Sequence, residues 1–160
     1  KTMKKLFLAF MMLVGTLTFA QTQAGNSFVG LNSSNIGFNT VQDSGVKNYN
    51  LGVQVGHFVV NKLAVVGSAG YAWTRVKNVG TTSEAISYEA GFKYYVENVL
   101  PVQIDYNGVE KQNYFGTQLG YAFFPSNNFS VEPTLRYDIA LKESYNNKFS
   151  FGFRFNYFFK

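Results

Sequence analysis

The strongest constraint on the fold is the alternation of residue types over the last twelve positions of the chain. From Phe149 to Phe159 every second residue is aromatic, and the residues between them are small or polar with the exception of Phe158. Successive side chains of a β-strand point to opposite faces of a sheet. The segment is therefore predicted to be a strand with one wholly aromatic face, which must meet either a protein core or lipid.

The same alternation recurs along the chain and divides it into eight segments. We expect strands at about Ser27–Val41, Asn48–Val59, Leu63–Thr74, Ile86–Val96, Leu100–Tyr106, Phe115–Phe123, Phe129–Leu141 and Phe149–Phe159. Turn residues separate them, as at Asn61-Lys62, Asn107-Gly108 and Pro125–Asn128. Closure of the sheet would remove its exposed edges. The sequence predicts an all-β protein, an eight-stranded antiparallel up-and-down transmembrane barrel.

Residues 1–20 have the layout of a cleavable signal peptide. Two lysines, Lys4 and Lys5, precede an apolar stretch, and small residues precede a plausible cut after Ala20. A second cut is possible after Ala24. The apolar stretch is shorter than the roughly 20 residues that a membrane-spanning helix needs. We therefore expect the chain to be exported from the cytoplasm. The sequence does not decide which of the two cuts is used.

One domain, residues 21–160, remains after removal of the signal peptide. Lys1 and Thr2 precede Met3 and are not expected to be native. The first twenty residues contain three lysines and no acidic residue, so the net charge falls from +5 to +2. No basic run suggests nucleic-acid binding. The chain has no cysteine, which excludes disulfides and thiol chemistry.

Charged residues within the strands fall on the face opposite the bulky apolar side chains. They are Glu89, Lys93, Asp105, Glu132, Arg136, Asp138 and Arg154. Most strand glycines share this face, as a narrow lumen requires. We therefore expect an interior ionic network, with Lys93 reaching Asp105 and both arginines close to Glu132 and Asp138. The alternative is a soluble lipocalin-like barrel that carries a small apolar ligand, with its apolar face inside.

Four aromatic residues interrupt the polar face close to strand ends: Phe58, Tyr95, Phe124 and Phe158. Either they form an apolar layer that closes one mouth of the barrel, or the alternation simply loosens at strand ends. With the ionic network, such a plug would leave no continuous water channel, which argues against general solute diffusion. Pro133 falls on the apolar face of the seventh segment, where it must lose a ladder hydrogen bond or occupy a bulge.

With these features, the chain resembles the small OmpA/OmpX-like outer-membrane β-barrel domains over about Gly25–Lys160. The resemblance implies the outer membrane of a Gram-negative bacterium, with lipid and lipopolysaccharide as neighbours. In that family the C-terminal strand is read by the barrel-assembly machinery, and Phe155, Tyr157 and Phe159 are the matching positions. This chain departs from many members by ending on Lys160. The family's roles include anchoring, adhesion and envelope integrity.

Catalytic chemistry finds little support in the sequence. The single histidine, His57, has no serine near it in sequence and is interpreted as an interfacial residue. We predict neither an enzyme nor a metal or cofactor site. Two classes remain: a monomeric envelope protein, structural or adhesive through its outer loops, and the carrier barrel. The expected outer loops are Asn39–Asn48, Lys77–Ser83, Asn107–Asn113 and Glu143–Lys148.

Overall fold

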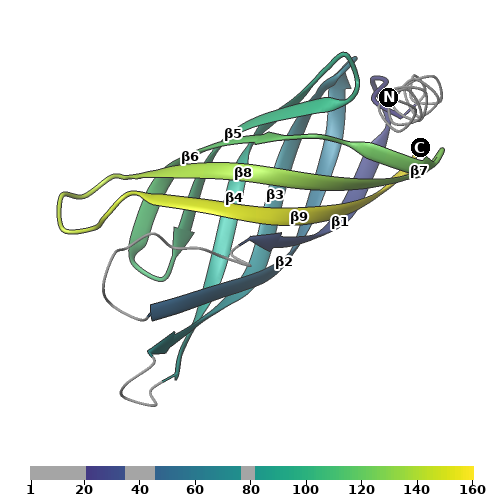
Figure 1. Cartoon of the computed structure of the whole chain (residues 1–160). Helices are drawn as coiled ribbons and strands as arrows, with labels where there is room; N and C mark the ends of the chain where they lie inside the picture. The colour runs from purple at the N-terminus through teal and green to yellow at the C-terminus, as the bar shows by residue number, and fades with distance from the viewer. Residues whose placement is uncertain (1–20, 35–45, 77–81) are drawn as a thin grey trace, which may run out of the picture.

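The computed structural model describes residues 21–34, 46–76 and 82–160, which contain nine β-strands in one antiparallel sheet (Figure 1). The strands are β1 (Ser27–Ser34), β2 (Val46–Val60), β3 (Leu63–Val76), β4 (Thr82–Val96), β5 (Leu100–Val109), β6 (Gln112–Gly120), β7 (Phe123–Ser126), β8 (Phe129–Ala140) and β9 (Lys148–Phe159). The signal peptide, the first strand beyond residue 34 and loop residues 39–45 and 77–81 lie outside the described residues. Within the described ranges, no helix is long and apolar enough to cross a membrane.

The sheet closes on itself. Strand β1 pairs with β9, with Ser27 opposite Phe159, and strand β6 pairs with β8 on the other side of the barrel. The short strand β7 continues β6 along the same partner, β8, so the barrel has eight strand positions around its axis. The predicted eight-stranded antiparallel barrel is therefore confirmed.

Pro133 explains why β6 and β7 are separate strands. The backbone N–H of Tyr121 donates to the Pro133 carbonyl at 3.1 Å, and proline has no N–H to return the second bond of this pair. The next residue, Ala122, instead donates to the Val99 carbonyl in the β4–β5 turn at 2.7 Å. The pairing register is the same on both sides of the break, with Gly120 opposite Thr134 before it. The proline thus costs a hydrogen bond without adding a bulge.

Two turns differ from the sequence prediction. Asn107 and Gly108 continue β5, and the chain reverses at Glu110-Lys111, where Glu110 has a φ of 54°. The expected outer loop Asn107–Asn113 is therefore a tight hairpin. Pro125 also belongs to a strand, β7, and that turn lies at residues 127–128.

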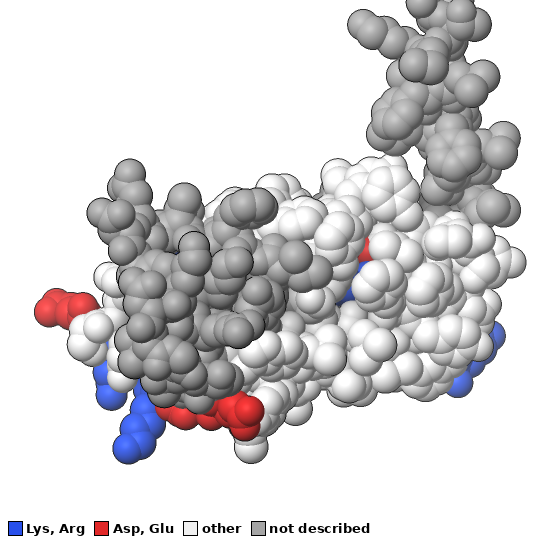
Figure 2. Space-filling model, turned by 60° about the horizontal axis from the view of Figure 1, so that its bottom comes forward, with Lys and Arg blue, Asp and Glu red and all other residues white. Residues whose placement is uncertain are grey.

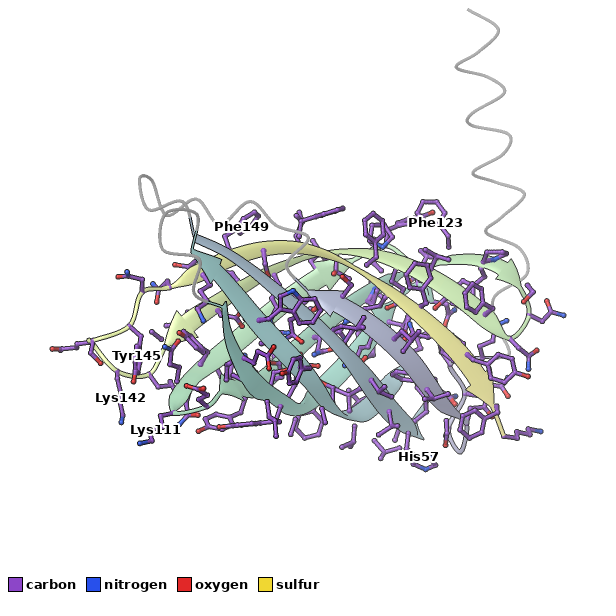
Figure 3. All side chains as sticks on the ribbon, turned by 90° about the horizontal axis from the view of Figure 1, so that it is seen from below. His57, Lys111, Phe123, Lys142, Tyr145 and Phe149 are labelled. Atoms are coloured by element: carbon purple, nitrogen blue, oxygen red, sulfur yellow. The ribbon has the colours of Figure 1, made fainter. Side chains whose placement is uncertain are left out.

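The barrel has two distinct ends. We call the end with the β2–β3, β4–β5 and β7–β8 turns and the C-terminus the turn end, on the right in Figure 1. The opposite end, with the β5–β6 turn and the β8–β9 connection, is the loop end. Each long strand runs at a tilt from one end of the barrel to the other. In Figure 3, Lys111, Lys142 and Tyr145 lie at the loop end, and His57 lies towards the turn end.

The apolar face of the sheet is on the outside. Ile104, Leu119 and Leu135, on neighbouring strands, are 47%, 53% and 47% exposed. On the face shown in Figure 2, uncharged side chains cover the middle of the barrel and charged side chains project at its two ends. A small recess in the middle also shows charged atoms. Because a lipocalin-like barrel needs this face inside, the arrangement excludes the soluble carrier alternative.

Candidate functional site

Five aromatic side chains fill the lumen at its turn end. They are Phe28, Phe58, Tyr95, Phe124 and Phe158, each at most 4% exposed, and we call them the aromatic layer. Ring centroids are 5.8 Å apart for Phe58 with Tyr95 and 5.8 Å for Phe124 with Phe158. A Cβ on Gly56 would collide with the ring of Phe28, so glycine makes the room for that ring.

The sequence pointed to four members of this layer and missed Phe28. Its neighbours Val29 and Leu31 are 38% and 55% exposed on the outer face. The alternation of strand β1 was therefore sufficient to place Phe28 inside. The structure brings all four predicted aromatic residues together with it.

A buried ion pair lies next to the aromatic layer. Lys93 Nζ is 2.5 Å from Glu132 Oε2, and both side chains are fully buried. Tyr95 and Ser130 donate their hydroxyls to Glu132 Oε1 at 2.7 and 3.1 Å. The ammonium also lies 5.0 Å from the ring centroid of Tyr95, a cation–π distance. The expected partner of Lys93, Asp105, was wrong, because Glu132 reaches the lysine across the lumen from β8.

Arg154 binds a group of amides and one carboxylate further along the lumen. Its guanidinium donates to Gln54 Oε1 at 2.7 Å, to Gln103 Oε1 at 2.6 Å and to Gln118 Oε1 at 3.0 Å. Its ion pair is with Glu89, at 3.3 Å. Glu132 lies opposite Arg154 in the β8–β9 register, yet its hydrogen bonds go to other groups.

Arg136 is the central cation of the loop-end half. It pairs with Glu89 at 2.7 Å and Asp138 at 2.9 Å, and a third pair joins it to Asp105. The Asn107 amide donates to Asp105 at 3.0 Å and to Asp138 at 2.9 Å. All these carboxylates and the guanidinium are largely buried. A buried charge is costly unless it is paired and hydrogen-bonded, and here each carboxylate has a cationic partner.

A small polar cavity of about 60 Å³ lies beyond Arg136 at the loop end. Amide and hydroxyl side chains line much of its wall, and charge comes from Glu89, Arg136, Asp138 and Lys148. Lys148 lies opposite Asp138 in the β8–β9 register. Its Nζ atom is 4.1 Å from the ring centroid of Tyr114. Sequence reasoning placed Lys148 in a loop and did not single out Tyr114, which is 2% exposed.

The described residues offer little for catalysis. His57 Nδ1 lies 3.0 Å from the hydroxyl of Ser27, a neighbour that the sequence could not reveal because β1 brings it there. Both groups are on the outer surface, and no carboxylate of the described residues is hydrogen-bonded to the imidazole to complete a triad. Nor do the described residues contain three His, Cys, Asp or Glu side chains placed so that together they could hold a metal ion.

The predicted assembly residues share the outer face of β9. Phe155, Tyr157 and Phe159 are 42%, 52% and 45% exposed. Strand β9 is also the strand that closes the barrel against β1. The three side chains therefore lie on the outer surface of the barrel, at its closing strand.

Comparison with known proteins defines the fold. No protein-family model matches the chain, and no curated protein sequence matches it. Among solved structures, the N-terminal β-barrel domain of Pseudomonas aeruginosa OprF matches 85% of this chain and 98% of its own, with 10% identity and a TM-score of 0.61. The Pseudomonas aeruginosa outer membrane protein OprG matches 86% of this chain and 97% of its own, at 11% identity and a TM-score of 0.54.

A third similar structure is Ail, the attachment invasion locus protein of Yersinia pestis. It matches 86% of this chain and 100% of its own, with 13% identity and a TM-score of 0.55. At these identities the likeness establishes the fold. The chain has the fold of the small OmpA/OmpX-like outer-membrane barrels, a transmembrane barrel of eight antiparallel strands.

Proposed function

We propose that the protein is an integral outer-membrane barrel with a sealed lumen that serves the cell envelope as a structural or surface-interaction protein. The observation that carries this proposal is the inversion of the usual core: apolar side chains face outwards, and paired charges fill the inside. Such a surface is stable in hydrocarbon, and closure pairs β1 with β9 and β6 with β8, as a sheet that spans a bilayer requires. The protein is not a general diffusion porin and not an enzyme.

Support for the sealed lumen comes from its contents. The aromatic layer occupies the turn end, and two clusters of hydrogen-bonded charges follow it, centred on Glu132 and Arg136. The cavity at the loop end ends on Arg136. Moving a hydrated solute through would require breaking several buried ion pairs at once, each of which is costly to separate. Solutes that enter from the loop end therefore stop at this cluster.

The proposed orientation puts the turn end in the periplasm and the loop end outside the cell. An even number of strands places both ends of the barrel domain on one side, and short turns are typical of the periplasmic side. The signal peptide, residues 1–20, would direct export. The barrel-assembly machinery would then read Phe155, Tyr157 and Phe159 on β9 before closure. The partners in the membrane would be lipid and lipopolysaccharide.

The proposed surface role places the contacts at the loop end. Lys111 and Lys142 are exposed at this end of the barrel, where Tyr145 also lies (Figure 3). Ail, which shares the fold, carries attachment in its name. A monomer would present these side chains to an extracellular ligand or another surface.

A substitution on the outer face tests membrane integration. Ile104 lies in the middle of β5, so Ile104→Arg places a charge in the bilayer and is expected to cost about 2–4 kcal/mol in lipid. The control is Glu110→Arg, at the turn of the same hairpin and outside the apolar band. Folding would be followed by heat-modifiable gel migration and by urea unfolding in lipid vesicles. Equal stability of the two variants would contradict the proposal, because a water-facing Ile104 tolerates arginine.

Ion currents across planar bilayers test the seal separately. The unaltered protein is expected to give no steady conductance, whereas a diffusion porin inserted in parallel conducts. A stable open current from the folded, heat-modifiable form would overturn the sealed lumen while leaving membrane integration intact.

A further inference from the structure

The six residues before β1, Gln21–Asn26, run across the turn end of the barrel, and we call them the strap. Thr22 joins two turns at once. Its carbonyl accepts a hydrogen bond from the backbone N–H of Lys62 in the β2–β3 turn at 2.6 Å. Its hydroxyl donates to Asn98 Oδ1 in the β4–β5 turn, also at 2.6 Å. Asn98 is only 4% exposed although it lies in a turn, so the strap covers this amide.

Gln21 joins the third turn. Its side-chain amide donates to the carbonyl of Asn127 in the β7–β8 turn. The carbonyl of Gln21 accepts from the Asn26 amide at 3.2 Å, which folds the strap back on itself. Gln21 and Thr22 are 5% and 2% exposed. The strap thus reaches all three turns of this end, two of them through side chains.

The middle of the strap is different. Gln23 and Ala24 are exposed, and a backbone contact connects Ala24 to the Asn61 side chain at 3.0 Å. The strap then enters the barrel ladder, where Gly25 donates to the Phe58 carbonyl at 2.9 Å. The side-chain contacts from the strap to the turns therefore come from Gln21 and Thr22 at its beginning, while Ala24 and Gly25 are held through their backbone.

Only one of the two possible signal-peptide cuts preserves these contacts. A cut after Ala24 would remove Gln21 and Thr22 and uncover the Asn98 amide, whereas a cut after Ala20 leaves the strap whole. We propose that the mature chain begins at Gln21 and that the strap is a lid attached to the barrel, closing the periplasmic mouth outside the aromatic layer. This inference rests on the proposed export to the outer membrane.

The processing step is a hydrolysis by a signal peptidase. Water adds across the peptide bond between Ala20 and Gln21, so that its hydroxyl completes the Ala20 carboxyl group and its remaining hydrogen completes the Gln21 amine. No oxidant or cofactor is needed. The new amino terminus lies at the barrel mouth beside the β7–β8 turn.

Mass spectrometry of the full-length protein purified from outer membranes tests the cut. The expected mass is that of residues 21–160. A mass corresponding to residues 25–160 would overturn the proposal, since no strap would then exist.

Thiol labelling tests the lid. The chain has no cysteine, so Ala64→Cys provides a single probe in the fully buried cluster at this end. In that background Thr22→Val removes the hydroxyl bond to Asn98, and Gln23→Ala is the matched control because Gln23 is exposed. Losing one hydrogen bond should raise the open fraction, and with it the maleimide labelling rate, about threefold to tenfold. The control should leave the rate unchanged.

A second variant separates opening from misfolding. Asn98→Gly removes the acceptor from the turn side, suits the φ of 62° at this position, and should raise labelling to the same extent as Thr22→Val. Both proteins should keep the heat-modifiable band of the folded barrel. Equal labelling of Thr22→Val, Asn98→Gly and Gln23→Ala would show that the strap is no lid. That outcome would not affect the Ile104→Arg test, so failure of the strap and failure of membrane integration are distinguishable.

Discussion

The two halves of the lumen fill the same narrow space in different ways. Towards the turn end, five rings pack together next to a single ion pair, Lys93 with Glu132, whose groups are fully buried. Towards the loop end, Arg136 holds three carboxylates and the lumen opens into a polar cavity. One half therefore depends mainly on apolar packing and the other on shared charge.

The difference has consequences for how each half tolerates change. Apolar packing is non-directional, so a ring can be replaced by another apolar side chain with partial loss. A buried carboxylate, by contrast, needs its partner in place, and Glu89, Asp105 and Asp138 all pair with Arg136. We infer that the turn-end half tolerates replacement of its rings by other apolar side chains. In the loop-end half, stability depends mainly on one residue, Arg136.

The largest expected effect is that of Arg136→Met. Removal of the guanidinium leaves three carboxylates near one another without their common cation, which should lower the free energy of unfolding by about 5 kcal/mol. Urea unfolding in lipid vesicles, followed by the fluorescence of the single tryptophan, Trp73, measures this change.

A ring substitution in the turn-end half is the matched comparison. Phe58→Leu keeps an apolar side chain, although a smaller one, and should cost about 1–2 kcal/mol, well below Arg136→Met. If Phe58→Leu destabilised the barrel as much as Arg136→Met, the turn-end half would be no more tolerant of substitution than the loop-end half, and the proposed contrast would be wrong.

The second prediction concerns Lys93 and Glu132. Lys93→Met alone leaves a buried carboxylate with two hydroxyl donors, and should cost about 3 kcal/mol. The double substitution Lys93→Met with Glu132→Gln removes both charges and keeps an acceptor for Tyr95 and Ser130. Because a buried pair replaced as a unit is nearly neutral, the double variant should return to within about 1 kcal/mol of the parent. Additive costs in the double-mutant cycle would contradict this.

The sequence predicted which side chains point into the lumen far better than which of them bind one another. Facing depends on the parity of neighbours along one strand, and this is visible wherever alternation is clean, as in β9. Partner choice across the lumen depends on the tilt and stagger of the strands, which no local pattern encodes. The sequence therefore predicted Asp105, across a hairpin, as the partner of Lys93, although Glu132 from β8 is its partner.

Turn prediction failed for a related reason. Asn107-Gly108 is a strong local turn signal, yet the Asn107 amide donates to Asp105 and Asp138 inside the lumen. Those interactions come from the closed barrel and outweigh the local preference. The glycine pattern, in contrast, carried usable information, because a crowded lumen permits only small residues at certain points.

The substitution with the smallest expected effect on the charged clusters, Gly116→Ala, tests how crowded the lumen is by adding a single methyl group. A Cβ on Gly116 would lie 2.6 Å from Asp105 Oδ1 and 2.7 Å from Asp138 Oδ1, and would also collide with the Arg136 guanidinium. Gly116→Ala should therefore displace the cluster and cost about 2 kcal/mol, as overpacking of a full interior does.

Gly67→Ala is the control for Gly116→Ala, because the nearest atom to its Cβ would be 3.9 Å away. It should change stability by less than about 0.5 kcal/mol, the usual range at uncrowded positions. Thermal heat-modification on gels and urea unfolding both rank the two variants. Equal stabilities would mean that the Arg136 cluster can move aside for a methyl group, and the loop-end half would then be as adaptable as the aromatic one.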